Sequence, residues 1–300
     1  MNEILRNKIE SFNFLSWEHR KENPPQNISY TKQLTNNEID LRLVITQLNL
    51  STGKQKKLND EWAEILPYLN NVKQLFLYSS VPQKIFDAIT RMTNLEGLFV
   101  KWSGNRIRNF ENISKLKSLK RLYLGSSTQT SDLKFIRNLS NLEWLEIHEQ
   151  KNLHSIEGIE SILNLKGFIL SGGINGKQKI NDIEPIKYLH ELEYLGLPST
   201  YIESEKLNPI CNLKKLKYLN LPIYYPMKQY ARIAAYIPNC DHGINAYRET
   251  GYKCTKCKTG VRVKPMRKNS KELCLNCDNI KIGVIIKEFN DLRERYVDEM

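Results

Sequence analysis

Four of the six cysteines stand in two close pairs toward the C-terminal end of the chain. The pairs are Cys254-x-x-Cys257 and Cys274-x-x-Cys277, with sixteen residues between them. Pairs of this kind form tight turns that together place four thiolates at the corners of a tetrahedron, the geometry that zinc prefers. Because sulfur would fill all four positions, we expect a structural zinc site rather than a catalytic one. Disulfide bonds are the weaker alternative, because the chain shows no export signal.

The residues around these cysteines predict the elements that would position them. Residues 260–274, GVRVKPMRKNSKELC, alternate apolar and polar side chains in the manner of a hairpin. Ile285, Phe289, Leu292 and Tyr296 then recur at helical spacing, which predicts an amphipathic helix after the second pair. The two cysteine turns, the hairpin and the helix together resemble a treble-clef or ribbon-type zinc finger.

Three other residues with metal-binding chemistry are expected to have no such role. Cys240 and His242 lie twelve or more residues upstream of the first pair and are the alternative ligands. Cys211 falls in an apolar helical segment, where packing explains a thiol. We therefore expect these three residues to be bystanders.

The segment that carries the first cysteine pair is strongly basic. Residues 253–271 contain eight basic residues and no acidic one. Such a segment predicts contact with phosphate or with an acidic protein, and a solvated hairpin is the simpler alternative. After Tyr252 it has no aromatic residue that could stack on a base. A nucleic-acid-associated adaptor is therefore the second hypothesis for function.

The larger part of the chain repeats one pattern seven times. Each copy reads apolar-x-x-apolar-x-apolar, as in Leu142-x-x-Leu145-x-Ile147, and the copies begin 23, 24, 23, 23, 27 and 24 residues apart. In a strand the last two apolar residues point to one face, which predicts a core face and an opposite, open face. Apolar residues upstream recur every three or four positions, which predicts short helices or turns over the core. The copies begin at Val72, Leu95, Leu119, Leu142, Leu165, Leu192 and Leu216.

A period in the twenties with this pattern resembles the leucine-rich repeats of bacterial internalins and phosphatase regulators, over about Thr46 to Pro222. The resemblance implies an α/β solenoid, with a curved parallel sheet on the concave face and short helices or turns on the convex face. Hydroxyl groups could replace part of the hydrogen bonding of the Asn that the family usually places in the turn. That position holds Ser80, Ser103, Ser127, Gln150, Gly173 and Thr200.

We expect three parts: an N-terminal helical cap over residues 1–44, the solenoid over 45–222, and a C-terminal cap with the zinc module over 223–300. Apolar residues from Ile4 to Leu15 predict an amphipathic helix over residues 3–20, which would cover the first repeat or, alternatively, dock a partner. A first strand is predicted at residues 45–50, with Asn49 in line with Phe76, and a helix at residues 59–69.

Aromatic side chains gather on the strand positions that face away from the core. Because parallel strands lie about 4.8 Å apart, Phe76, Phe99 and Tyr123 should form a continuous row. A contiguous aromatic patch typically marks a binding surface, and the alternative is that these rings stack on one another or are covered by the N-terminal segment or a neighbouring copy. The candidate partner-binding residues are Phe76, Tyr78, Phe99, Lys101, Arg121, Tyr123, Trp144, Glu146, His148, Tyr194 and Tyr218.

Composition and motifs favour protein recognition over catalysis. The net charge of +12 and the pI near 9.3 favour a partner with an acidic surface. His148 beside Glu146 is the nearest approach to a catalytic pair. Residues 171–179, SGGINGKQK, lack the Gly-Lys-Ser or Gly-Lys-Thr order of a phosphate-binding loop and predict a plain longer loop.

The sequence therefore predicts a non-enzymatic scaffold that binds a partner protein through an aromatic-rich concave face. Within this class, the resemblance suggests an intracellular inhibitor or immunity protein against a toxin. No apolar stretch approaches the roughly eighteen residues that would span a bilayer, so we expect no membrane contact and a cytoplasmic location.

Overall fold

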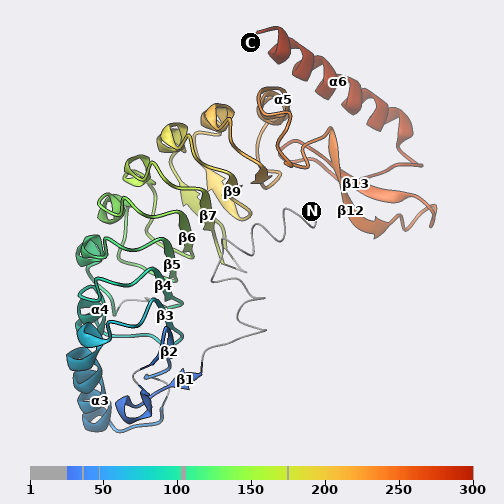
Figure 1. Ribbon diagram of the computed structural model, residues 1–300. Helices are drawn as coiled ribbons and strands as arrows, with labels where there is room; N and C mark the ends of the chain where they lie inside the picture. Colours follow the sequence, from blue (N-terminus) through green and yellow to red (C-terminus); the bar gives the residue numbers. More distant parts are fainter. Residues whose placement is uncertain (1–25, 36, 47, 103–105, 174–175, 300) are drawn as a thin grey trace.

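Successive parallel strands form one curved sheet of nine strands, with the short helices outside it (Figure 1). This computed structural model describes residues 26–35, 37–46, 48–102, 106–173 and 176–299. The helix predicted over residues 3–20 lies outside them. In spatial order the strands are β1 (Asn27–Ile28), β2 (Asp40–Leu43), β3 (Gln74–Leu77), β4 (Gly97–Val100), β5 (Arg121–Gly125), β6 (Trp144–His148), β7 (Gly167–Ser171), β9 (Tyr194–Gly196) and β11 (Tyr218–Asn220).

Equivalent residues of successive repeats lie side by side, because the parallel strands pair in a constant register. Leu98 pairs with Leu75 on one side and with Leu122 on the other. The same column continues through Leu145 and Phe168, and all five side chains are buried. Since one repeat cannot cover its own core face, each column stabilises the sheet only when its neighbours are present.

The convex side is built from short helical turns that bury one isoleucine each. Ile113, Ile136, Ile159, Ile186 and Ile210 are fully buried beneath the chain of their own turns. Before β11 the described convex segments include two α-helices, one before and one within the copy that begins at Val72. The elements are η1 (Thr31–Gln33), α3 (Thr52–Ile65), η2 (Leu66–Tyr68), α4 (Gln83–Ile89), η3 (Glu111–Lys115), η4 (Lys134–Ile136), η5 (Ile159–Ser161), η6 (Glu184–Tyr188) and η7 (Asn208–Asn212).

The first strand of the repeat region starts earlier than the sequence pattern predicts. Strand β2 covers Asp40–Leu43, not residues 45–50, and Arg42 rather than Asn49 lies next to Phe76. The reason is that α3 is 14 residues long, so more chain is needed between β2 and β3 than between later strands. Ile45 is buried in the core without belonging to a strand.

Polar side chains bond the turn backbone where the related repeats usually place Asn. Gln150 donates to the carbonyls of Leu124 and His148 at 3.2 and 3.0 Å, and Thr200 donates to the carbonyl of Leu170 at 2.6 Å. In the first repeat the Ser79 hydroxyl, rather than Ser80, accepts bonds from two backbone N–H groups. Ser103 lies outside the described residues.

The last repeat is followed by α5 (Met227–Tyr236), β12 (Tyr247–Lys253), β13 (Val261–Pro265), β14 (Leu273–Cys274) and α6 (Asn279–Asp298). Tyr225 is buried beside the last turns, where its hydroxyl donates to the Thr200 carbonyl at 3.0 Å and accepts from Ile202 N–H at 3.1 Å. The Tyr225 carbonyl in turn accepts from Lys268 N–H at 2.8 Å. The module therefore packs directly against the end of the repeats. Within the described ranges, no helix is long and apolar enough to cross a bilayer.

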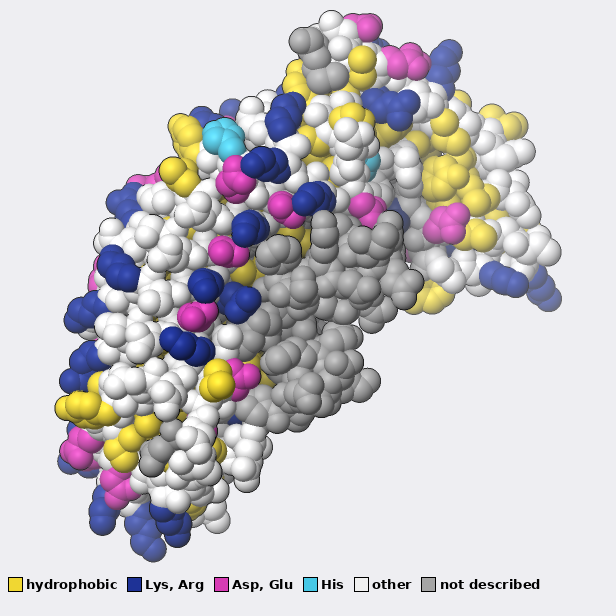
Figure 2. All heavy atoms as spheres, viewed as in Figure 1, with side chains coloured by type: hydrophobic (Ala, Val, Ile, Leu, Met, Phe, Trp, Pro, Cys, Tyr) yellow, Lys and Arg dark blue, Asp and Glu magenta, His cyan; other side chains and the backbone are white. Residues whose placement is uncertain are grey.

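Charges alternate strictly along the edge of the solenoid where the strands begin. From β3 onward, the residue before each strand bonds its backbone to the residue before the next, and the side chains alternate between Lys and an acid. Figure 2 shows both signs interspersed along the repeats. Glu96, for example, lies 3.9 Å from the Lys73 ammonium and 2.8 Å from that of Lys120. The series runs Lys73, Glu96, Lys120, Glu143, Lys166, Glu193, Lys217 and Asp241.

Lys120→Glu should lower the free energy of unfolding by about 1 kcal/mol, because a carboxylate would then stand between Glu96 and Glu143. Urea unfolding at low and high salt measures the loss, which high salt should reduce. Lys151→Glu is the control, because Lys151 is exposed in the turn after β6 and has no ion pair with a described residue.

The pH dependence of the same variant gives a second check. The Lys120 ammonium donates a hydrogen bond to Glu96 and holds the pKa of that carboxyl below its ordinary 4.5. A carboxyl with a lowered folded-state pKa stabilises the protein above its unfolded pKa, and this stabilisation is lost as pH falls through the folded pKa. The difference between wild type and Lys120→Glu should therefore shrink below about pH 4. A difference that persists there would show that charge is not its cause.

Candidate functional sites: the concave face and the four-cysteine cluster

Columns of side chains cross the concave face with one residue from each strand. In β6, Trp144, Glu146 and His148 alternate with the core residues Leu145 and Ile147. The register continues these columns from strand to strand, as predicted from the repeats. The middle column runs Arg42, Phe76, Phe99, Tyr123, Glu146, Ile169, Gly196 and Asn220, and the column before it Asp40, Gln74, Gly97, Arg121, Trp144, Gly167, Tyr194 and Tyr218.

The first aromatic run extends over β3 to β6. The ring centroids of Phe76 and Phe99 lie 6.2 Å apart, and those of Phe99 and Tyr123 lie 4.2 Å apart. Tyr123 then stacks on the His148 ring at 4.7 Å, while Tyr78 contacts Phe99 at 5.2 Å. The predicted continuous row therefore exists.

This row is not open to solvent, which differs from the expectation. Phe76 is 0% exposed and Phe99 is 1% exposed, and they form a hydrophobic cluster separate from the main core. Tyr78 and Tyr123 flank the cluster and are half-buried. Phe99 contacts the rings of Phe76 and Tyr123 on the two neighbouring strands. The accessible members of the run are its tyrosines and His148.

A second aromatic run joins β6, β9 and β11. Trp144 lies 5.3 Å from Tyr194, which stacks on Tyr218 at 4.6 Å. Gly167 of β7 makes room for this run, because a Cβ atom there would come within 2.1 Å of the Trp144 ring. Burial raises the pKa of the Tyr194 and Tyr218 hydroxyls, so both stay protonated and neutral at physiological pH. The repeat pattern predicted the rings of this run but not the role of the glycine.

Glu146 and His148 lie between the two runs. The Glu146 carboxylate is 6% exposed, accepts a hydrogen bond from Trp144 Nε1 at 2.8 Å, and lies 3.3 Å from His148 Nε2. The carboxylate therefore fixes the orientation of a ring on each side. Lys101 and Arg121 add positive charge to the face, with the Lys101 ammonium 5.4 Å from the Tyr78 ring centroid.

The four paired cysteines converge at one point in the C-terminal module. Their sulfur atoms all lie within 4.8 Å of one another, with Cys254 and Cys277 4.0 Å apart and Cys257 and Cys274 3.6 Å apart. Tetrahedral ligands at a Zn–S distance of about 2.3 Å would be about 3.8 Å apart. The donor set and its spacing therefore fit one structural zinc ion.

The local backbone supports this arrangement of sulfurs. Gly260 N–H donates to Cys257 Sγ at 3.3 Å, and a Cβ atom at Gly260 would come within 2.5 Å of Cys274 Sγ. Backbone bonds, that of Gly260 first, lower the pKa of Cys257 to about 6, whereas the sulfurs of Cys257 and Cys274 raise the pKa of Cys277 to about 12. Four thiolates this close need a cation between them to be charged together.

The other metal-capable residues lie elsewhere. Cys211 and Cys240 are buried in the main hydrophobic core, where burial raises the pKa of their thiols to about 11 and about 12. His242 Nδ1 accepts a hydrogen bond from Ile244 N–H at 2.9 Å. None of the three belongs to the four-sulfur cluster.

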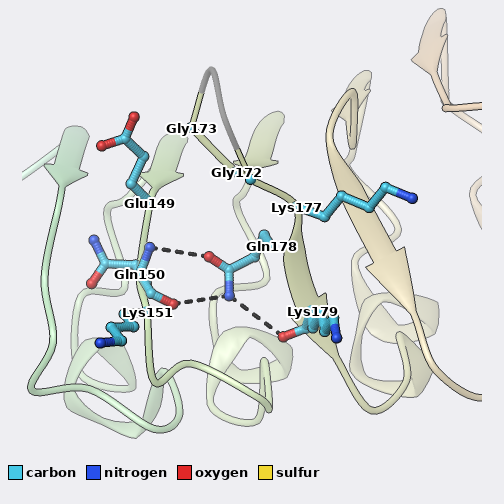
Figure 3. Close-up of a pocket in the computed structure, with 9 residues that line it drawn as sticks. Glu149, Gln150, Lys151, Gly172, Gly173, Lys177, Gln178 and Lys179 are labelled. Atoms are coloured by element: carbon cyan, nitrogen blue, oxygen red, sulfur yellow. Dashed lines mark hydrogen bonds between the residues drawn. The ribbon is translucent and has the colours of Figure 1, made fainter.

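A polar cleft of about 560 Å3 lies at the glycine-rich excursion after β7 (Figure 3). Gln178, at the start of β8 (Gln178–Ile180), bonds the backbone of Gln150 in both directions at 3.0 Å. Lys151 and Lys179 lie on its rim. Strand β8 pairs with β10 (Thr200–Ile202), so the excursion adds a second small sheet rather than a phosphate cradle.

Comparison with known proteins gives similarity to solved structures only. No protein-family model and no curated protein sequence matches the chain. Internalin C2 from Listeria monocytogenes is 26% identical over 51% of this chain and 63% of its own, with a TM-score of 0.41. A leucine-rich-repeat protein of Leptospira interrogans is 18% identical over 71% of this chain and 51% of its own, with a TM-score of 0.49.

A plant protein is also similar. The leucine-rich-repeat ectodomain of a membrane receptor kinase from Arabidopsis thaliana, solved in complex with CASPARIAN STRIP INTEGRITY FACTOR 2, is 21% identical over 65% of this chain and 23% of its own, with a TM-score of 0.40. The repeat period and the in-register parallel sheet of the chain itself define its fold. It is an α/β leucine-rich-repeat solenoid with a cysteine cluster in its C-terminal module.

Gly167→Ala should displace the Trp144 ring and lower the free energy of unfolding by about 1–3 kcal/mol, because the added methyl group overpacks the face. Urea unfolding measures this loss. Gly283→Ala is the matched control, because nothing lies within 4 Å of its added Cβ and alanine favours the helix. Equal stability of Gly167→Ala and wild type would show that the ring does not depend on the glycine.

The purified protein should contain about one zinc ion per chain, and Cys277→Ser should lose most of it. Mass spectrometry of the metal measures the content, and the melting temperature should fall in the variant or with a strong chelator. Cys240→Ala is the control and should retain the metal. Metal-free wild-type protein with an unchanged melting temperature in chelator would contradict the assignment.

Proposed function

We propose that the protein is a non-enzymatic recognition scaffold that binds a partner protein through its concave face. The observation that supports this proposal is the pair of aromatic runs that cross successive strands of the solenoid. Contact would be made by the half-buried side chains, and the buried Phe76, Phe99, Trp144 and Glu146 would hold them in place. The contact residues are Tyr78, Lys101, Arg121, Tyr123, His148, Tyr194 and Tyr218.

Such a surface suits binding because its rings are already ordered. Tyr194 and Tyr218 are stacked at an interplanar angle of 10°, and Tyr123 lies on His148 at 19°. Ordered tyrosine rings offer large contact area and lose little side-chain entropy when a partner binds. The lysine and arginine of the face, together with the net charge of +12, favour an acidic partner surface.

The geometry around His148 favours binding over catalysis. A general base needs a free path to a substrate proton, whereas Glu146 is buried and hydrogen-bonded to Trp144. The described side chains around His148 are packed against one another, with the Tyr123 ring stacked on the His148 ring. We therefore infer that the Glu146–His148 contact orients the aromatic runs.

The nucleic-acid alternative draws less support from the basic module. Carboxylates already accompany three of its cations: Glu272 lies 2.8 Å from Arg262, Glu288 lies 3.6 Å from Arg267, and Glu205 lies 2.7 Å from Lys268. These pairs reduce the positive potential available to phosphates. The inhibitor or immunity role against a toxin, and the cytoplasmic location, stay predictions.

The double substitution Tyr194→Ala with Tyr218→Ala should abolish capture of the partner from native lysate. The expected loss is at least tenfold, because stacked aromatic side chains concentrate binding energy. Quantitative mass spectrometry of the captured proteins, after nuclease treatment and high-salt washing, measures the loss. Tyr188→Ala, which removes an exposed ring from the convex turn η6, is the control. Equal capture by all three proteins would refute the concave-face proposal.

A further inference from the structure

A groove on the C-terminal module lies apart from the concave face. It has a volume of about 500 Å3 and runs between the segment that joins β13 to β14 and the first turns of α6. Apolar side chains form a large part of its lining. None of the described residues that line the groove is aromatic. The apolar ones are Pro265, Leu273, Ile280, Val284 and Ile285.

Helix α6 has apolar side chains on two sides in its first half. Ile282, Ile285 and Phe289 are buried, and the helix packs against α5. Ile280 and Val284 are 81% and 64% exposed. Four residues apart, these two lie one above the other on the same side of the helix. Large apolar side chains this exposed at a groove are typical of a contact surface.

The rim of the groove is basic. Arg267, Lys268, Lys271 and Lys281 line it, against one carboxylate, Glu288. Arg267 pairs with Glu288 in the groove, whereas Lys268 and Lys281 have ion pairs outside it. The three basic side chains are nevertheless 44%, 44% and 72% exposed. Exposed pairs of this kind contribute at most about 1 kcal/mol, so a partner's carboxylates can replace them.

We propose that this groove binds an acidic segment of a partner protein, with an apolar side chain of that segment seated between Leu273 and the Ile280–Val284 side of α6. Charge complementarity selects the occupant: basic residues surround an apolar floor. Nucleic acid fits less well because the lining offers no ring for a base to stack on. A second copy of the chain, meeting groove to groove in a two-fold contact, would bring like charges together.

The cysteine cluster sets the position of both walls of the groove. Leu273 directly precedes Cys274 in β14, and α6 begins two residues after Cys277. Cys274 N–H also donates to the Asp278 carboxylate at 3.0 Å, which ties the strand to the start of the helix. The groove is therefore a second contact surface, independent of the concave face, whose shape depends on the cluster.

The test uses the full chain and a displayed library of short random peptides. Enriched peptides should carry Asp or Glu around a large apolar residue, and the strongest is then titrated by fluorescence anisotropy. Ile280→Asp should weaken its binding at least tenfold, because it places a carboxylate on the apolar wall. Lys271→Glu should weaken it severalfold. Val297→Asp and Lys287→Glu make the same changes on α6 outside the groove and should leave binding unchanged.

Enrichment of basic or uncharged peptides, or equal binding by Ile280→Asp and Val297→Asp, would overturn the proposal. Competition by a short single-stranded oligonucleotide that is as strong as competition by the unlabelled peptide would overturn it too. So would self-association in sedimentation velocity that Ile280→Asp removes. Far-ultraviolet circular dichroism and urea unfolding confirm that each variant is folded. Tyr194→Ala with Tyr218→Ala should bind the peptide as the wild type does, which separates this groove from the concave face.

Discussion

Stacking of repeats is the constraint on which the rest of the molecule depends. Each strand presents apolar side chains on one side, and a single repeat has nothing of its own to cover them. The constant register brings Leu75, Leu98, Leu122 and Leu145 into one buried column, and the isoleucines of the convex turns close it from the other side. A two-residue periodicity in each strand also fixes which side chains reach the concave face.

The concave face follows from that register but adds its own packing. Rings from neighbouring strands contact one another, and Gly167 lets Trp144 lie against the backbone of β7. A buried carboxylate, Glu146, then links Trp144 to His148. The described side chains of the face thus hold one another in place, and ordered rings of this kind suit recognition of a protein.

The C-terminal module consists of short strands and the helix α6, of which Ile282, Ile285 and Phe289 are buried. The four sulfurs gather the β13–β14 pair and the start of α6 within one small volume, while Tyr225 and Lys268 join the module to the last repeat. A metal ion bound there would stabilise the elements that carry its ligands. The backbone bonds of the charged edge continue to Asp241, whose N–H donates to the Lys217 carbonyl at 2.9 Å.

The sequence by itself determined the features that depend on local periodicity. The repeat pattern predicted the strand faces from β3 onward, and the spacing of the cysteines predicted their convergence, because both follow from geometry within a few residues. The helix of α6 was predicted for the same reason. Tertiary structure decided the rest: the length of α3 places the strand before β3 at Asp40–Leu43, and Phe76 and Phe99 are buried rather than exposed. Burial and strand offset depend on what lies opposite a residue, and a one-dimensional pattern does not contain that information.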